Sequence, residues 1–341
     1  MKFVKNYLPN FSHIYLEERA RDYPITKLIM DKYKSANVVE INHYKDFFNR
    51  QNQDFQLQKS SMKLIIAKKT SPFLYPASEM IQEYQSPNVF YNTPILNCIY
   101  NCDYCFLQGM YPSGNLVVFV NEQDYFDSVK KQLKNLDDPS QPMILSISYN
   151  TDIMATENII PLTSRWIEFV DVLKNIKIEI RTKSALFRSL SKIQPSKNVI
   201  LSWSLSPNLV CKKYERTAPS LKKRLKAMKL AIEMGWAVRL CIDPILYIED
   251  WETIYGEFIS NIFNEIDHTK LIDVTLGVFR MNKDYYNRIR RRETKSDLFY
   301  EKYSVENNLV TVPIKDRKRM IKTIREQLVP LIDEKMILTW E

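Results

Sequence analysis

Short apolar runs alternate with amphipathic stretches along most of the chain. Beyond residue 88, strand-like runs lie at residues 90–96, 143–149, 177–183, 199–206, 237–243 and 272–279. Between most of them apolar residues recur with helical spacing, as in the stripe of Leu221, Leu225, Met228 and Ile232. Gly235 follows this stripe and suits a helix C-terminal cap. Strands that alternate with helices indicate a parallel sheet, and six βα units predict a partial (β/α)6 barrel, too small for the closed eightfold form.

The first 85 residues lack this regular alternation. They contain a helical pattern at residues 25–35, strand-like runs at 37–41 and 62–68, and a linker-like stretch at 70–76. We therefore predict an α/β fold with a small N-terminal α/β domain over residues 1–85 and the partial barrel over residues 86–341. Near the C-terminus, residues 300–313 could form a hairpin around Glu306, Asn307 and Asn308, so the barrel is expected to carry a hairpin and helix extension.

The strands of the predicted barrel have one apolar and one polar face. In the run at 237–243 the apolar residues alternate with Arg239, Cys241 and Asp243, which leaves these three on the face toward the lumen. The same parity places further polar residues there: Lys177, Glu179, Arg181, Lys183, Ser202, Ser204, Ser206, Asp273 and Thr275. A polar lumen suits a charged cofactor. The solvent-exposed face of an ordinary sheet would have the same pattern.

The composition narrows the class of protein. With 45% hydrophobic residues and 12% aromatic residues, the chain can build a large core, which excludes intrinsic disorder. We expect no membrane span and no signal peptide, because no run of 18 apolar residues occurs and the N-terminus lacks an apolar stretch. Five glycines are too few for a dinucleotide-binding or P-loop fingerprint, and we find neither. The net charge of +9 favours a polyanionic partner.

Three of the five cysteines lie within eight residues, as a C-x3-C-x2-C motif formed by Cys98, Cys102 and Cys105. Such spacing is not a disulfide framework, and it predicts a local metal site in a reducing, cytoplasmic setting. Three thiolates in one tight loop can hold a [4Fe–4S] cluster and leave one iron open for a substrate or cofactor. A zinc site is the alternative, although it would ordinarily recruit a fourth Cys or a His nearby.

The motif, placed after the first strand of a partial barrel, resembles that of radical S-adenosylmethionine (SAM) enzymes. Within that superfamily the chain resembles the spore photoproduct lyase family along nearly its whole length. The matching stretches are YLEERARDYP at 15–24, NCDYCFLQ at 101–108, VFVN at 118–121, Thr151-Asp152, RTK at 181–183, the segment 204–227 and DPILYIEDW at 243–251.

The resemblance implies a role for several residues. Cys98, Cys102 and Cys105 would hold the cluster, whose open iron would bind SAM. Reductive cleavage of SAM would give a 5′-deoxyadenosyl radical, which in this family takes hydrogen from the lesion so that the link between two thymines breaks. Lys183 matches the family's SAM-contacting lysine, which agrees with its predicted place in the lumen. Ser204 and Ser206 match the region that contacts the SAM ribose, with Ser206 in place of an asparagine.

Two positions depart from the family. The family's hydrogen-donor cysteine aligns with Tyr149. The family also uses two tyrosines to relay hydrogen back to SAM. The first matches Tyr104, and the second aligns with Phe106, which has no hydroxyl. Either the relay is rewired through Tyr104 and Tyr149, or the substrate differs from the usual thymine lesion. Cys241 is a conceivable replacement donor, because parity places it in the lumen; a buried core cysteine is the plainer interpretation.

Two basic runs, at residues 212–229 and 280–295, follow predicted strands and should lie at the same rim as the cysteine loop. Arg neutralises phosphate and Tyr offers a stacking face, so we predict a DNA-binding surface there. Its residues would be Lys212, Lys213, Arg280, Tyr285, Arg290, Arg291 and Arg292.

The sequence thus predicts a monomeric radical SAM lyase that repairs a thymine-type photolesion in DNA and receives electrons from a donor such as flavodoxin or ferredoxin. One alternative is a radical SAM enzyme that acts on another nucleic-acid lesion or modified base. Another is a DNA-binding protein with a purely structural cluster, which would need neither Lys183 nor a polar lumen.

Overall fold

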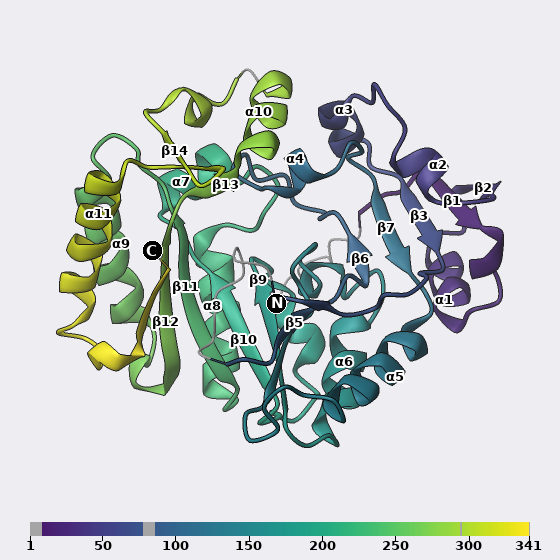
Figure 1. Cartoon of the computed structure of the whole chain (residues 1–341), viewed down its shortest axis with the longest axis horizontal. Helices are drawn as coiled ribbons and strands as arrows, with labels where there is room; N and C mark the ends of the chain where they lie inside the picture. The colour runs from purple at the N-terminus through teal and green to yellow at the C-terminus, as the bar shows by residue number, and fades with distance from the viewer. Residues whose placement is uncertain (1–8, 78–85, 294, 341) are drawn as a thin grey trace, which may run out of the picture. The chain divides into compact units, whose positions relative to one another are not determined.

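A computed structural model describes residues 9–77, 86–293 and 295–340. The chain divides into two compact units, each built from several stretches of sequence. The first unit comprises Met1–Ile99, Tyr111–Ile180 and Ser189–Val199, and the second comprises Tyr100–Met110, Arg181–Arg188 and Ile200–Glu341. Figure 1 follows the elements from the N-terminus to the C-terminus.

The first unit contains a five-stranded sheet in the order β2-β1-β3-β7-β6. Its strands are β1 (His13–Glu17), β2 (Asn37–Ile41), β3 (Leu64–Ala67), β6 (Ile95–Leu96) and β7 (Leu116–Phe119). All pairs are parallel except β6 with β7. The central strands β3 and β7 are wholly buried because all eight of their residues are apolar. Helices α1 (Pro24–Lys32), α2 (Lys45–Phe48) and α3 (Phe55–Ser60) connect the N-terminal strands.

The same unit contains the first strands of the regular βα alternation, the last of them up to Ile180. Strand β5 (Val89–Tyr91) pairs in parallel with β8 (Met143–Ser146), which pairs in parallel with β9 (Ile176–Thr182), and the short β4 (Tyr75–Pro76) is antiparallel to β5. Helices α5 (Glu122–Leu133) and α6 (Leu162–Asp171) lie in the connections. Each buries one apolar side, and α6 packs Trp166, Ile167 and Val170 into the core.

The second unit continues the alternation with parallel strands β10 (Val199–Ser204), β11 (Ala237–Ile245) and β12 (Leu271–Val278), followed by β16 (Ile337–Trp340) beside β12. Its helices are α4 (Leu107–Met110), α7 (Asn208–Tyr214), α8 (Leu221–Glu233), α9 (Trp251–Glu265) and α11 (Ile314–Leu328). The apolar stripe of α8 is buried as predicted, and Gly235 has the positive φ of 85° that suits a C-terminal cap.

A small antiparallel sheet follows β12. It consists of β13 (Arg280–Asn282), β14 (Ser304–Glu306) and β15 (Leu309–Thr311), with helix α10 (Lys283–Arg292) and the 3₁₀ turn η5 (Asp297–Tyr300) between β13 and β14. Glu306 pairs with Leu309, which leaves Asn307 and Asn308 as a two-residue turn, both with positive φ. A type I′ turn requires this geometry and favours Asn, so the predicted hairpin is confirmed.

The predicted α/β class and the order of the later strands are confirmed, with one correction. The run at 90–96 is two strands, β5 and β6, and β6 belongs to the five-stranded sheet. Pro94 separates them, because proline has no N–H to donate to a strand neighbour. The cysteine loop therefore follows β6 and does not directly follow the first barrel strand.

The domain boundary predicted near residue 85 lies outside the described residues, and the boundary itself stays a prediction. The N-terminal sheet nevertheless draws β6 and β7 from beyond it, because β3 needs an apolar neighbour on its second edge. Among the described helices, none combines the length and the apolar character that a membrane crossing requires.

Candidate functional site: a buried polar network beside the cysteine loop

The first cysteine follows a sharp backbone turn at Asn97. Asn97 has a φ of 73°, in the left-handed region that asparagine tolerates better than most residues. Its buried amide donates hydrogen bonds to the carbonyl oxygens of Ser113 (2.9 Å) and Asn115 (3.0 Å), while its Oδ1 accepts one from the Cys98 N–H at 2.9 Å. Lys59 donates to both Asn97 Oδ1 and the Cys98 carbonyl. These contacts within the first unit fix the backbone at Cys98.

The second and third cysteines lie in the segment Tyr100–Met110 of the second unit. The Cys105 N–H donates to the Cys102 carbonyl at 3.0 Å, and the Gln108 side chain donates to the same carbonyl at 2.6 Å. Cys102 also forms an isolated antiparallel bridge with Glu215, next to the hydrogen bond from the Asp103 N–H to the Tyr214 carbonyl at 2.8 Å. The backbone after α7 therefore holds this part of the loop.

Glu215 is the centre of a buried polar network in the second unit. Its side chain has no exposed area, and it accepts hydrogen bonds from the Tyr104 hydroxyl and from the Ser206 hydroxyl at 3.1 Å. Burial disfavours its charge, but Lys183 and Arg224 lie near enough to lower the pKa of Glu215 overall. The carboxylate thus stays ionised inside the protein and gathers residues from three separate segments.

Arg224 balances the charge of Glu215. Its side chain is fully buried, forms an ion pair with Glu215, and donates to the carbonyl oxygens of Pro219 (2.7 Å) and Ser204 (3.3 Å). Arg224 belongs to the basic run at 212–229, yet its position on the buried side of α8 excludes it from any surface for phosphate. Such a pair is strongly destabilising to break, because either partner alone would be an uncompensated buried charge.

Lys183 and Tyr104 lie next to each other. The Lys183 ammonium is 5.4 Å from the centroid of the Tyr104 ring. Burial works against the charge of Lys183, yet the pKa of its ammonium is raised because Glu215 and Cys102 are close. Burial, together with Glu215 and Cys102, raises the pKa of Tyr104 well above its ordinary value, so the phenol keeps its proton. Three of the predicted cofactor residues, Lys183, Tyr104 and Ser206, are therefore adjacent to one carboxylate.

The predicted polar face of the strands is confirmed within the second unit. The parallel register pairs Ser202 with Arg239 and Ser204 with Cys241, and these pair in turn with Asp273 and Thr275 of β12. The charges neutralise one another: Arg239 binds Asp273, while Asp243 binds Arg181 at 3.3 Å and Arg280 at 3.0 Å. Although burial opposes its charge, the pKa of Asp243 is lowered by Arg280 and Arg181. Cys241 is completely buried on this face.

Tyr149 lies in the first unit, three residues beyond the end of β8 at Ser146. Its ring packs on Tyr91 with centroids 4.5 Å apart and contacts the buried pair Val89 and Ile144. Tyr91 in turn stacks on Tyr75 at 5.1 Å. Strand geometry thus ends before residue 149, as a hydrogen-donor role for Tyr149 would require.

The residues predicted to bind DNA differ in their surroundings. Lys212, Arg290 and Arg291 are exposed, and Lys213 is exposed beside Asp297. Arg292 is half-buried and donates to the Gln108 carbonyl at 2.8 Å. Arg280 is 10% exposed, lies between Asp243 and Trp340, and is poorly placed to reach a phosphate. The DNA-binding surface stays a prediction. The placement of the exposed cations favours their part in it, and the placement of Arg280 does not.

The two basic runs do meet beside the cysteine loop. Arg216 binds Asp103 of the loop at 2.9 Å and Glu293, at the end of α10, at 2.8 Å. Helix α10 packs on α4, where Gly109 is so close to Tyr285 that an added Cβ would lie 2.5 Å from the Tyr285 backbone. Tyr285 therefore serves first as a packing residue against the loop.

The thiols of the loop suit an iron–sulfur cluster in their chemistry. Cys98 and Cys102 are buried, Cys105 is partly buried, and none of the five cysteines is in a disulfide. The ammonium of Lys183 offsets negative charge at Cys102 and Cys105. Within the described ranges, no group of three or more His, Cys, Asp or Glu side chains is arranged to hold a single metal ion. Cys98 belongs to the first unit and the other two to the second.

Sequence reasoning missed the residues that organise this network. Glu215 and Arg224 were grouped with the basic run, and Asn97 received no role. A signal for Glu215 is present, because it is the only acid among the many cations of residues 212–229. A lone acid in such a run is a candidate for a buried ion pair.

Known proteins resemble this chain in sequence. The family model described as "Spore photoproduct lyase" matches residues 7–308. The chain is 22% identical to spore photoproduct lyase of Bacillus subtilis (strain 168) over 262 residues, which cover 74% of this chain and 72% of the relative. It is 19% identical over 268 residues to spore photoproduct lyase of Clostridium acetobutylicum, with 76% of each covered.

Solved structures share the fold. A mutant spore photoproduct lyase matches with a TM-score of 0.81 at 18% identity, over 96% of this chain and 98% of the other. Another mutant, solved with bound AdoMet and dinucleoside spore photoproduct, matches with a TM-score of 0.80 at 19% identity, over 98% and 99% of the two chains. The α/β fold with parallel sheets is that of these structures and is consistent with a partial radical SAM barrel.

Proposed function

The chain belongs to the spore photoproduct lyase family, and from this premise we propose that it repairs a thymine-type photolesion in DNA through the buried network around Glu215. The family consists of radical SAM lyases that repair spore photoproduct. The observation that carries the proposal is the convergence of Lys183, Tyr104 and Ser206 on Glu215, beside Cys102 and Cys105.

In this proposal each residue has a distinct task. Cys98, Cys102 and Cys105 would hold a [4Fe–4S] cluster. With SAM bound, such a cluster would supply the electron for reductive cleavage of SAM to methionine and a 5′-deoxyadenosyl radical. Lys183 would pair with the SAM carboxylate as a point charge, and Ser204 and Ser206 would contact the ribose region. The hydrogen bond from Tyr104 to Glu215 fixes the direction of the phenol, and burial raises the pKa of Tyr104 so that the phenol stays protonated.

Tyr149 is the proposed hydrogen donor to the substrate, with Tyr104 as the relay residue. A phenolic O–H is a donor of one hydrogen, as a thiol is. Cys241 is the second candidate donor, and its complete burial on the polar strand face favours a packing role instead.

A second candidate function follows from Tyr149 and Phe106, which replace a thiol and a phenol of the family. The bulkier Tyr149 ring, held against Tyr91, favours a substrate that differs in shape from the usual lesion. A radical SAM enzyme for another nucleic-acid lesion or modified base would have the same cofactor residues. We further propose a reduced flavodoxin or ferredoxin as electron donor, a monomeric state, and a cytoplasmic location in keeping with loop cysteines that form no disulfide.

The test is anaerobic incubation with SAM, a reductant and dinucleoside spore photoproduct, with products identified by mass. We expect 5′-deoxyadenosine together with the repaired thymine dinucleoside, and neither product with the Cys102→Ala control. If SAM is cleaved and the dinucleoside persists, the substrate is another nucleic-acid lesion or a modified base, as in the second candidate function. If SAM is not cleaved, a structural cluster in a DNA-binding protein is the correct interpretation.

A further inference from the structure

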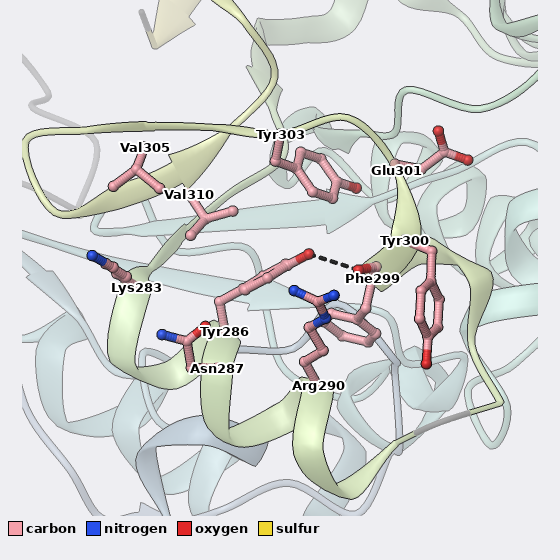
Figure 2. Close-up of a pocket in the computed structure, with 10 residues that line it drawn as sticks. All are labelled: Lys283, Tyr286, Asn287, Arg290, Phe299, Tyr300, Glu301, Tyr303, Val305 and Val310. Atoms are coloured by element: carbon pink, nitrogen blue, oxygen red, sulfur yellow. Dashed lines mark hydrogen bonds between the residues drawn. The ribbon is translucent and has the colours of Figure 1, made fainter.

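A separate pocket lies in the second unit between helix α10 and the hairpin, away from the Glu215 network. Its volume is about 290 Å³, at the small end of ligand-binding pockets. One wall is a single face of α10, formed at helical spacing i, i+3, i+4 and i+7 by Lys283, Tyr286, Asn287 and Arg290. The opposite wall comes from η5 and the hairpin: Phe299, Tyr300, Glu301, Tyr303, Val305 and Val310. Figure 2 shows these side chains around the pocket.

The floor of the pocket is apolar and fixed. Phe299, Val310 and Tyr286 are 1%, 3% and 6% exposed. The Tyr286 hydroxyl donates to the Phe299 carbonyl at 2.9 Å, the bond drawn in Figure 2, so its ring is held in place. A rigid aromatic floor is suited to a flat ring system rather than to a flexible chain.

The rim carries two cations, Lys283 and Arg290, against one acid, Glu301, and an open aromatic face. Tyr300 is 60% exposed, and the Arg290 guanidinium lies 5.8 Å from its ring centroid. Lys283 stands at the other end of the α10 face, and the helix as a whole holds five cations against one acid in KDYYNRIRRR. Cations next to a stacking ring are the combination that binds a nucleobase and its phosphate.

One buried polar group in the pocket lacks a protein partner. The Tyr303 hydroxyl is buried and has no hydrogen-bond partner among the described residues. A buried hydroxyl without a partner is costly, and a ligand that supplies a hydrogen bond would remove that cost. The edge of a nucleobase provides both donors and acceptors.

We propose that this pocket binds one unpaired nucleobase of a single-stranded DNA segment, with Lys283 and Arg290 on its phosphates. The inference rests on the proposed function for DNA as the partner, and it adds a base-binding site apart from the lesion site. A base inside a duplex is stacked on both faces, so only an unpaired base can present its face to Tyr300 and its edge to Tyr303.

The experiment compares binding of fluorescein-labelled hexathymidylate with binding of an abasic oligonucleotide of equal length, by anisotropy at fixed salt. We expect Tyr300→Ala to weaken binding of hexathymidylate by about fivefold or more and to leave the abasic affinity unchanged. Tyr300→Phe keeps the ring and should retain the wild-type affinity. Tyr303→Phe removes only the buried hydroxyl and should weaken the binding of hexathymidylate without weakening that of the abasic oligonucleotide.

If Tyr300→Ala and Tyr303→Phe both bind hexathymidylate as tightly as the wild type does, the pocket does not hold a base and the proposal is overturned. Cleavage of dinucleoside spore photoproduct by the wild type is measured in parallel, because a dinucleoside tests the reaction alone. Base-dependent binding without cleavage would overturn the proposed reaction and support the pocket. If the dinucleoside is cleaved and neither Tyr300→Ala nor Tyr303→Phe changes the binding of hexathymidylate, the proposed reaction is supported and the base-binding pocket is overturned.

Discussion

The Tyr104 hydroxyl donates its hydrogen bond to the carboxylate of Glu215, a residue 111 positions further along the chain. This contact ties the side chain between the second and third cysteines to the ion pair of Glu215 with Arg224. The cysteine loop, the polar ends of the strands and helix α8 therefore depend on one buried pair of charges.

Removing either member of that pair should destabilise the second unit. We expect Glu215→Ala or Arg224→Ala to lower the free energy of unfolding by about 3–5 kcal/mol, because each leaves a buried charge without its partner. Urea denaturation measures this. The double variant Glu215→Leu/Arg224→Met, which removes both charges, should be more stable than either single variant. A loss in the double variant equal to the sum of the two single losses would show that the pair is not coupled.

The same carboxylate predicts a dependence of stability on pH. The pKa of Glu215 in the folded protein lies below the ordinary value of 4.5, so its contribution is complete above that pH and is lost as the pH falls through the folded value. Urea midpoints measured downward from pH 6 should therefore fall less steeply in Glu215→Gln than in the wild type. Glu252→Gln, a change at a side chain that is 54% exposed, serves as the control and should keep the wild-type slope.

The three cysteines should be required for iron. Protein purified without oxygen is expected to contain about four irons per chain and to have the absorption and electron spin resonance of a [4Fe–4S] centre. Alanine at Cys98, Cys102 or Cys105 should abolish it, whereas Cys211→Ala should retain the iron. Stoichiometric zinc in the wild type would contradict the cluster.

Tyr149 and Cys241 can be separated as hydrogen donors. We expect Tyr149→Phe to cleave SAM normally and to stall product formation or divert it to adducts, because the ring keeps its packing on Tyr91 and loses only its hydrogen. Cys241→Ala should mainly cost stability, on the order of 1 kcal/mol, as a buried truncation. Product masses decide between them. Clean turnover in Tyr149→Phe with failure in Cys241→Ala would transfer the role to the thiol.

The arginines at the end of α10 should differ in their effects on DNA binding. Arg290 and Arg291 are exposed, so each change to Gln should reduce the log–log salt slope of binding by roughly 0.7–0.9 if that residue neutralises one phosphate. Arg292 binds the Gln108 carbonyl, and Arg292→Gln should disturb the loop with a smaller change in slope. An unchanged slope in Arg290→Gln/Arg291→Gln would show that these arginines are exposed to solvent and contact no phosphate.

Local sequence predicted the parts of the fold that depend on local physics. Hydrophobic periodicity located α8 and the later strands, and the Asn307-Asn308 pair indicated the hairpin because both residues tolerate positive φ. It failed where a partner distant in sequence decides. Strand β7 is only four residues long and is defined by its pairing with β3, and Pro94 split a continuous apolar run between two sheets.

The residue types of the candidate site could be predicted from the sequence, but the contacts between them could not. The spacing of Cys98, Cys102 and Cys105 predicts thiolate ligands. Strand parity put Cys241 on one face with Ser204 and Thr275, and the strand register pairs these three residues. The role of Glu215 depends on a contact between segments 111 residues apart, which periodicity cannot reveal. The same limit made Arg224 and Arg280 look like surface cations, although their partners hold them inside.

The contact of Gly109 with Tyr285 constrains how this protein can diversify. Any side chain at position 109 would meet the backbone of α10 and not a flexible group that could move aside. A side chain at position 109 would therefore fit only if α10 moved away from the loop of the cysteines. Transplanting either segment alone into a related scaffold would separate two surfaces that fit each other closely at Gly109 and Tyr285.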